Sequence, residues 1–214
     1  MAGENALTVA PETATIVRPA SFVLADVAVR SDVAGLDEAL RLAAERGRGS
    51  TDLADITAAV RSMYKAVGLD PTKVRPSSEA LVRRVRRGEP LPRINTAVDV
   101  VNWCSMESQL PFGLYDATRI EGEIVLRLGR DGEAYPGIRK DVVHVAGRLT
   151  VADDAGPFGN PTSDSARTMV TCATTCLFVV IYAPPTVPVA HVDRVVATTR
   201  ERLQCYCGPR TLEG

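Results

Sequence analysis

Residues 91–127, LPRINTAVDVVNWCSMESQLPFGLYDATRIEGEIVLR, contain the densest run of structural signals in the chain. Thr96 and Asp99 match the capping box, in which a hydroxyl caps a helix and a carboxylate lies three residues later, so a helix should begin at Thr96. It should end before Pro111, because a proline ring disfavours helical geometry in the preceding residue. The alternating pattern of residues 120–127 then predicts a strand.

Polar and glycine residues of this stretch are the first candidates for a site. Asp99 and Asn102 are three residues apart, so they should share one face of the helix. Gly113 follows the proline, where a backbone without a side chain can approach a ligand closely. The stretch therefore predicts a helix, a corner and a strand, with an amide and a glycine available near the corner.

The same stretch resembles the editing domain of the phenylalanyl-tRNA synthetase β subunit, the B-three/B-four tRNA-binding domain, which also occurs in free-standing proteins. Three family motifs follow one another here. Val-Asp-x-x-Asn-aromatic occupies residues 98–103, Pro-x-x-x-aromatic-Asp occupies 111–116, and Gly-x-Ile-x-x-Arg occupies 122–127. The resemblance extends from about Arg75 to about Pro184.

The resemblance implies hydrolysis, in trans, of the ester that joins an amino acid to the terminal ribose of a mischarged tRNA. Such an ester is already activated, so a site can act by placing a water, stabilising the developing oxyanion and holding the amino group. The residues that the resemblance assigns to catalysis are Asn102 and Thr171. Those that it assigns to the substrate pocket are Gly113, Asp116, Gly156, Gly159, Asn160, Asp164 and Arg167.

Three polar positions of the synthetase site differ in this sequence. Val101 stands where the synthetase has a threonine, and Gly113 stands where it has a histidine. Thr171 stands where it has the glutamate that recognises the substrate amino acid. We therefore expect a substrate amino acid that is smaller than tyrosine or differs from it in polarity.

Positive charge is concentrated in residues 61–93, where nine basic residues face three acidic ones although the whole chain has a formal net charge of -1. A helix starting at Ser77 or Ser78 should carry several of these arginines on its outer face. They suit the negative end of the helix dipole, and they also suit an RNA backbone. The candidates for contact with the acceptor end of tRNA are Arg75, Arg83, Arg84, Arg86, Arg87 and Arg93.

The remaining segments predict an α+β fold, with helices packed on a mostly antiparallel sheet. Residues 1–20 should form a loose arm or an edge segment. Residues 21–74 should add a strand and two helices to the same domain, and residues 75–214 should form the editing-like domain with a C-terminal helix from about Pro188. In that part, residues 142–145 and 149–151 are candidate strands, residues 153–164 a long loop, and residues 167–182 two strands or one bent strand.

Composition excludes several other kinds of protein. No apolar run approaches eighteen residues, and the N-terminus lacks the pattern of a signal peptide, so we expect a cytoplasmic protein. The five cysteines favour reduced thiols, and their spacing does not suit a zinc site. Nucleotide-binding loops, a serine-hydrolase elbow and a metalloprotease helix are missing from the sequence. We expect no metal, no cofactor and no DNA partner.

Two other functions remain open at this point. The fold can persist as a non-catalytic module that binds RNA or a ligand, since the histidine and the glutamate of the synthetase site are absent. The same pocket can also serve a hydrolase of small esters or amides. Activity on mischarged tRNA distinguishes both from an editing domain.

Overall fold

The computed structural model describes residues 7–49, 53–138 and 141–209. In these ranges the helices are α1 (Leu36–Gly49), α2 (Ala54–Ala66), α3 (Ser77–Arg86), α4 (Thr96–Ser108) and α5 (Val189–Cys207), with the 3-10 helices η1 (Pro11–Thr13) and η2 (Ala117–Arg119). The strands are β1 (Thr8–Val9), β2 (Ala20–Leu24), β3 (Phe112–Asp116), β4 (Val125–Leu128), β5 (Ala134–Pro136), β6 (Val142–His144), β7 (Leu149–Asp153), β8 (Gly156–Asn160), β9 (Ser163–Asp164) and β10 (Leu177–Ile181).

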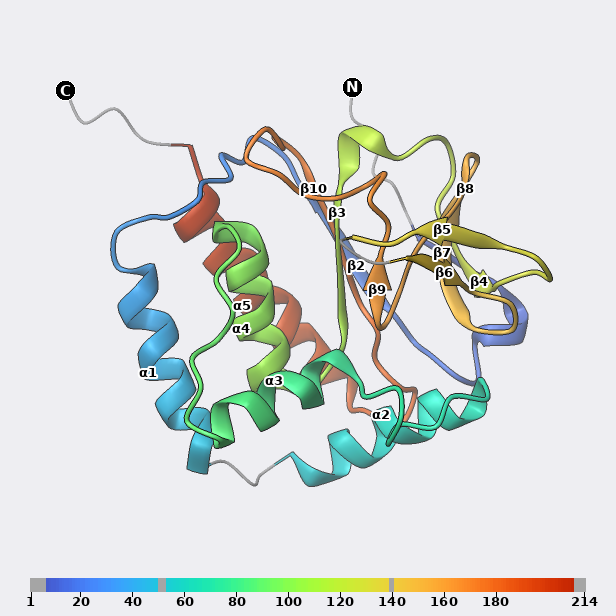
Figure 1. Cartoon of the computed structure of the whole chain (residues 1–214), viewed down its shortest axis with the longest axis horizontal. Coiled ribbons are helices and arrows are strands. Elements are labelled where there is room, and N and C mark those ends of the chain that lie inside the picture. Colours follow the sequence, from blue (N-terminus) through green and yellow to red (C-terminus); the bar gives the residue numbers. More distant parts are fainter. Residues whose placement is uncertain (1–6, 50–52, 139–140, 210–214) are drawn as a thin grey trace.

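The fold is α+β, with the helices gathered on one side of the strands (Figure 1). A three-stranded antiparallel sheet has the order β2-β10-β3, and its central strand β10 is completely buried. A five-stranded sheet has the order β1-β4-β7-β8-β9, in which the pairing of β1 with β4 is parallel and the other pairings are antiparallel. Strands β5 and β6 form a separate antiparallel pair. Helix α4 packs between α5 and α3 and also contacts β3.

Helix α4 begins at Thr96 as predicted, but the residue that caps it differs from the one expected. Asn95 is the cap, and its side chain accepts a hydrogen bond of 3.0 Å from the Val98 amide. The Thr96 hydroxyl instead accepts a bond of 3.1 Å from the amide of Arg30, a contact between segments far apart in sequence. The helix ends as predicted before Pro111, because Gln109 adopts a left-handed conformation with φ of 61°.

The N-terminal segment is not a loose arm in its described part. Thr8 pairs with Val125 of β4, and its amide donates to the carbonyl of Ile124 at 2.9 Å. Thr13 and Val17 are buried. Residues 1–6 of the predicted arm lie outside the described residues.

Several strand boundaries also differ from the sequence-based expectation. Residues 153–164 were expected to form a loop, but they contain β8 and β9, and a tight turn joins β7 to β8 at Gly156, whose φ is 112°. The strand expected over residues 120–127 is reduced to β4, because pairing with β7 starts only at Val125. Residues 167–176 form no strand, so β10 alone remains of the expected 167–182 region.

Candidate active site

A cavity of about 320 Å³ opens between α4, β3 and the turn that connects β8 to β9. Its walls come from six separate stretches of the chain, which the fold brings together. The residues that line it are Ser77, Ile94, Val98, Val101, Asn102, Ser105, Phe112, Leu114, Ile138, Pro161, Thr162, Ser163, Asp164, Met169 and Val170.

Burial separates the lining into a floor and a mouth. The floor consists of the buried residues Val101, Ser105, Phe112, Leu114 and Val170, together with Pro161. The mouth consists of the less buried residues Ser77, Ile94, Val98, Asn102, Ile138, Thr162, Ser163, Asp164 and Met169. Hydrocarbon therefore dominates the floor, whereas amide, hydroxyl and carboxylate groups gather at the mouth.

Asn102 reaches the cavity because it shares a face of α4 with Val98, Val101 and Ser105. This is the spacing of three and four residues that places side chains on one side of a helix. Asp99 is also three residues from Asn102 on this helix, but it does not line the cavity. Asp99 is completely buried, and its carboxylate accepts bonds from the Ile94 amide at 2.8 Å and from Arg93 Nε at 2.7 Å.

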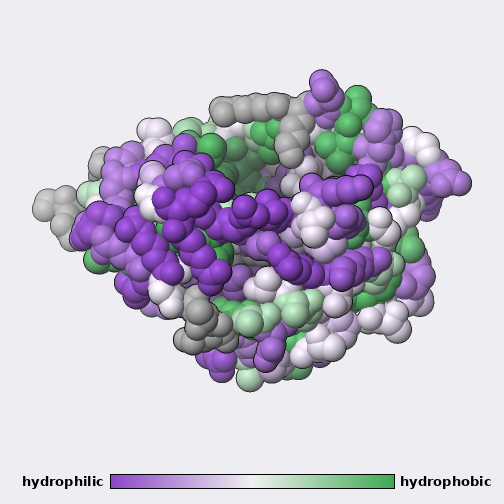
Figure 2. Space-filling view, turned by 60° about the horizontal axis from the view of Figure 1, so that its bottom comes forward, coloured by the Kyte–Doolittle hydropathy of each residue, from purple (hydrophilic) through white to green (hydrophobic). Residues whose placement is uncertain are grey.

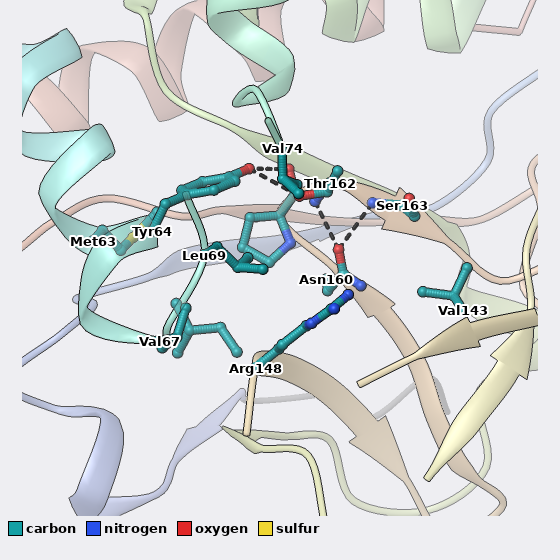
Figure 3. Close-up of a pocket in the computed structure, with 12 residues that line it drawn as sticks. Met63, Tyr64, Val67, Leu69, Val74, Val143, Arg148, Asn160, Thr162 and Ser163 are labelled. Carbon is teal, nitrogen blue, oxygen red and sulfur yellow. Dashed lines mark hydrogen bonds between the residues drawn. The ribbon is translucent and has the colours of Figure 1, made fainter. Parts of the chain in front are cut away.

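The β8–β9 turn forms the opposite wall of the cavity and is held by hydrogen bonds from three elements. Asn160 Oδ1 accepts from the amides of Thr162 at 2.8 Å and Ser163 at 3.0 Å, as Figure 3 shows. Asn160 Nδ2 donates to the Tyr135 hydroxyl at 2.9 Å, and that hydroxyl donates to the Ser163 carbonyl at 2.5 Å. From α2, Tyr64 donates to the Pro161 carbonyl at 3.0 Å. The turn is therefore fixed before any ligand binds.

A second, smaller cavity of about 50 Å³ lies behind the same turn (Figure 3). Pro161, Thr162 and Ser163 line both cavities, so the turn is a partition between them. The small cavity lies between α2 and β7, and Arg148 extends toward Asn160 along one side of it. Its volume suits one or two small molecules of solvent, and the larger cavity is the better candidate for a substrate.

Asp164 is the one charged residue among the described lining residues of the large cavity. Burial raises the pKa values of Tyr115 and Tyr182 well above the ordinary value of 10.0, and the negative charge of Asp164 raises them further. The two tyrosine hydroxyls bond to each other at 3.0 Å behind the cavity. Asp164 thus lines the cavity with one carboxylate oxygen, Oδ1, buried, and its charge acts on the tyrosines behind the cavity.

Two glycines that were expected to contact substrate instead make room for Tyr115. A Cβ atom on either Gly113 of β3 or Gly159 of β8 would collide with the Tyr115 ring. Tyr115 is completely buried and packs edge-on against Phe158. Neither glycine lines the large cavity, so both positions serve packing between the two sheets.

Four more of the expected pocket or catalytic residues have structural partners outside the cavity. Asp116 accepts bonds from the amide of Thr118 and from Thr174 Oγ1, and Arg167 forms a paired contact with Asp153 at 2.8 and 3.0 Å. Gly156 is the first residue of β8, directly after the β7–β8 turn, and pairs with Asp153. The Thr171 hydroxyl accepts a bond of 3.2 Å from the Ala173 amide within a turn. Asn160 borders only the small cavity, so Asn102 and Asp164 alone of the expected catalytic and pocket residues line the large one.

Several of the expected RNA-binding arginines pair with carboxylates of the chain. Arg93 bonds to Asp99 and Asp32 and also contacts Asp37, so three carboxylates surround it. Arg75 pairs with Glu79, and Glu89 pairs with both Arg84 and Arg87. Arg83 and Arg86 are exposed on α3, and Arg87 is exposed at its C-terminal cap. Figure 2, which turns the lower side of Figure 1 toward the viewer, shows hydrophilic side chains gathered on this side beside a hollow with hydrophobic walls.

The sequence contained a usable signal for part of the missed lining. Starting from Asn102, steps of three or four residues along α4 lead to Val98 and Ser105, which both line the cavity. The contributions of Thr162 and Val170 had no comparable local signal, since they depend on how distant segments meet.

The described residues contain neither a candidate metal cluster nor a helix suited to cross a membrane. Among them, no group of three His, Cys, Asp or Glu side chains is placed to hold a metal ion. No helix in the described ranges is long and apolar enough to cross a membrane. All five cysteines are free thiols.

In a comparison with known proteins, residues 59–204 match the family model described as the B3/4 domain. The phenylalanine–tRNA ligase beta subunit of Cutibacterium acnes is 34% identical over 104 residues, which cover 48% of this chain and 12% of that protein. The corresponding subunit of Paramagnetospirillum magneticum is 34% identical over 65 residues, covering 30% of this chain and 8% of that protein. This chain therefore spans a small part of the length of these relatives.

A solved structure gives a weaker likeness. The N-terminal fragment of the phenylalanyl-tRNA synthetase beta-subunit from Pyrococcus horikoshii superposes with a TM-score of 0.48 and 11% identity, covering 94% of this chain and 48% of that chain. The family match begins before Arg75 and ends after Pro184, so it is longer than the motifs alone suggested. Because the matched residues make up well over half of the chain, this protein belongs to the B3/4 domain family.

Proposed function

We propose that this protein binds the acceptor end of tRNA and hydrolyses the ester of a mischarged aminoacyl-tRNA in the large cavity. Membership of the B3/4 family and similarity to phenylalanine–tRNA ligase beta subunits support this reaction. The observation that carries the proposal is the position of Asn102, whose amide lies at the mouth of a cavity with a hydrocarbon floor. An aminoacyl ester has the same division into an apolar side chain and polar reacting groups.

Hydrolysis of this ester requires little beyond the correct placement of the water and the ester. A water adds to the ester carbonyl, the resulting oxyanion collapses, and the ribose oxygen leaves with a proton. In our proposal the Asn102 side-chain amide donates a hydrogen bond to the developing oxyanion, the kind of contact that stabilises a transition state more than the substrate. The rigid turn at residues 161–164 holds the ester and the water in register with this amide.

The exposed part of α3 is the proposed contact for the RNA backbone. Ser77 at the start of this helix lines the cavity, and the exposed arginines occupy its last turn. A rise of 1.5 Å per residue separates Ser77 from Arg84 by about 10 Å along the helix axis. Phosphates close to the acceptor end therefore lie within reach of the arginines when the terminal ribose is at the cavity.

A deacylation assay tests the reaction. Asn102→Ala should lower kcat on the best mischarged tRNA by about 100-fold, the usual effect of losing one oxyanion donor. Gln204→Ala is the matched control, because it removes an exposed amide from α5 and should leave kcat unchanged. Absence of hydrolysis across a complete panel of mischarged tRNAs would refute the proposed reaction.

Salt-dependent binding tests the RNA contact separately. Replacing Arg83, Arg84, Arg86 and Arg87 together by Gln should weaken tRNA binding and reduce the dependence of the binding constant on salt. The control variant replaces three exposed arginines elsewhere, Arg119, Arg130 and Arg194. Unchanged affinity in the α3 variant would exclude this helix, whereas salt-dependent binding without turnover would identify a non-catalytic RNA-binding module.

A further inference from the structure

The hydrocarbon floor of the large cavity has one side-chain polar atom among its described residues, the Ser105 hydroxyl. This hydroxyl donates its hydrogen to the Leu110 carbonyl at 2.7 Å, inside the turn that ends α4. It therefore has no hydrogen left to offer a ligand. A polar side chain placed on this floor would lose its water and find little in exchange, which costs free energy.

The mouth is more polar than the floor, although it also includes Ile94, Val98, Ile138 and Met169, and it has one negative charge. Asp164 supplies that charge, and it lies in β9 next to a turn held by Asn160 and Tyr135. One oxygen of this carboxylate, Oδ1, is buried, which limits the freedom of the side chain. A fixed carboxylate beside an apolar pocket favours a cation whose uncharged part enters the pocket.

We propose that the acyl group accepted by this cavity is that of an aliphatic amino acid, with its side chain on the floor and its α-ammonium group against the Asp164 carboxylate. The inference rests on the proposed hydrolysis of aminoacyl-tRNA and specifies the substrate class of the same site. Valine and leucine fit this description. Serine, threonine and tyrosine do not, because their hydroxyls would meet Val101, Phe112 or Val170.

A pair of isosteric substrates gives the sharpest test of the floor. Valine and threonine differ by a methyl group and a hydroxyl, so valyl-tRNA and threonyl-tRNA made on the same tRNA occupy the same volume. We expect kcat/KM to favour the valyl ester by about 100-fold, the limit for rejecting an added hydroxyl in an apolar pocket. Val170→Thr should reduce this preference, and the matched control Val125→Thr, on β4 away from the cavity, should keep it.

N-acetylation of the substrate tests the contact with Asp164, because it removes the α-ammonium charge. We expect acetylation of valyl-tRNA to lower kcat/KM in the wild-type protein by about tenfold or more, in keeping with the strength of a charged hydrogen bond. Asp164→Asn should be much less sensitive to acetylation. Asp131→Asn, an exposed carboxylate in the β4–β5 turn, should behave like the wild type.

Binding of amide-linked, non-hydrolysable valyl- and threonyl-adenosine separates this inference from the proposed reaction. Tighter binding of the valyl compound without turnover of any ester would support the inference and refute the reaction. Hydrolysis that favours the threonyl ester, or binding that does not distinguish the two compounds, would overturn the inference and leave the reaction intact. Equal sensitivity of the wild type and Asp164→Asn to acetylation would overturn the role of Asp164.

Discussion

Replacing Asn160 by Ala should loosen the wall of the large cavity and lower the stability of the whole protein. The side chain is 5% exposed and makes three hydrogen bonds, to the amides of Thr162 and Ser163 and to the Tyr135 hydroxyl. No neighbouring group in the turn is placed to replace all three. The change therefore removes the side chain that sets the path of the chain from β8 to β9.

The expected loss of stability follows from these hydrogen bonds. Each contributes about 1 kcal/mol net, and a buried partner left without a bond costs more than an exposed one. Thr162 and Ser163 are half-buried, so water satisfies part of their loss. We expect the free energy of unfolding to fall by about 2–3 kcal/mol. For a chain of this length that corresponds to a decrease in Tm of roughly 5–10 °C.

Urea unfolding followed by circular dichroism measures the change, and Asn102→Ala is the comparison. Asn102 lies on α4, outside the turn, and is only half-buried, so its replacement should lower activity with a stability change below about 0.5 kcal/mol. Asn160→Ala should lower both the activity and the free energy of unfolding. Asn160→Asp keeps the acceptor for the two amides and should recover part of the stability. A free energy of unfolding for Asn160→Ala within 0.5 kcal/mol of the wild type would refute this reasoning.

Three further predictions concern packing and charge. Gly159→Ala should destabilise the protein by about 1–3 kcal/mol in thermal unfolding, because the new methyl group meets the buried Tyr115 ring. Burial raises the pKa of Asp99 despite its bonds to Ile94 and Arg93. The stability of the wild type relative to Asp99→Asn should therefore be greatest below pH 3.8, and it should decrease as pH rises through the raised pKa. The hydrogen bond from Arg61 lowers the pKa of Glu79. The wild type should therefore be more stable than Glu79→Gln above pH 4.5, and this advantage should be lost as pH falls through the lowered pKa.

Each of these three predictions has a measurement and an outcome that would contradict it. Gly49→Ala lies at the end of α1 with nothing within 4 Å of the added methyl, so it should leave Tm nearly unchanged. A Gly159→Ala protein as stable as Gly49→Ala would contradict the packing argument. Chemical unfolding between pH 3 and 7 tests both carboxylates, and a stability difference that does not vary with pH would contradict either assignment.

Local sequence patterns were sufficient for the helices. The apolar spacing of three and four residues in α1, α2 and α5 and the proline after α4 depend on neighbours within a few positions. The motifs around Asn102 likewise indicated the family that the longer match supports. Even so, Asn95 replaced Thr96 as the cap of α4, because the Thr96 hydroxyl is engaged by Arg30, a residue far away in the chain.

The composition of the cavity depended on tertiary structure. Thr171 appeared polar and well placed, yet the neighbouring Val170 lines the floor while the Thr171 hydroxyl closes a turn. Arg93 appeared free for RNA, yet three carboxylates surround it, and two of them, Asp32 and Asp37, come from a distant segment. Sequence determines local conformation through short-range sterics and hydrogen bonds. Which side chains share a hollow is decided when β10 pairs with β2 and β3 and the β8–β9 turn meets α4, because those contacts join residues far apart in the chain.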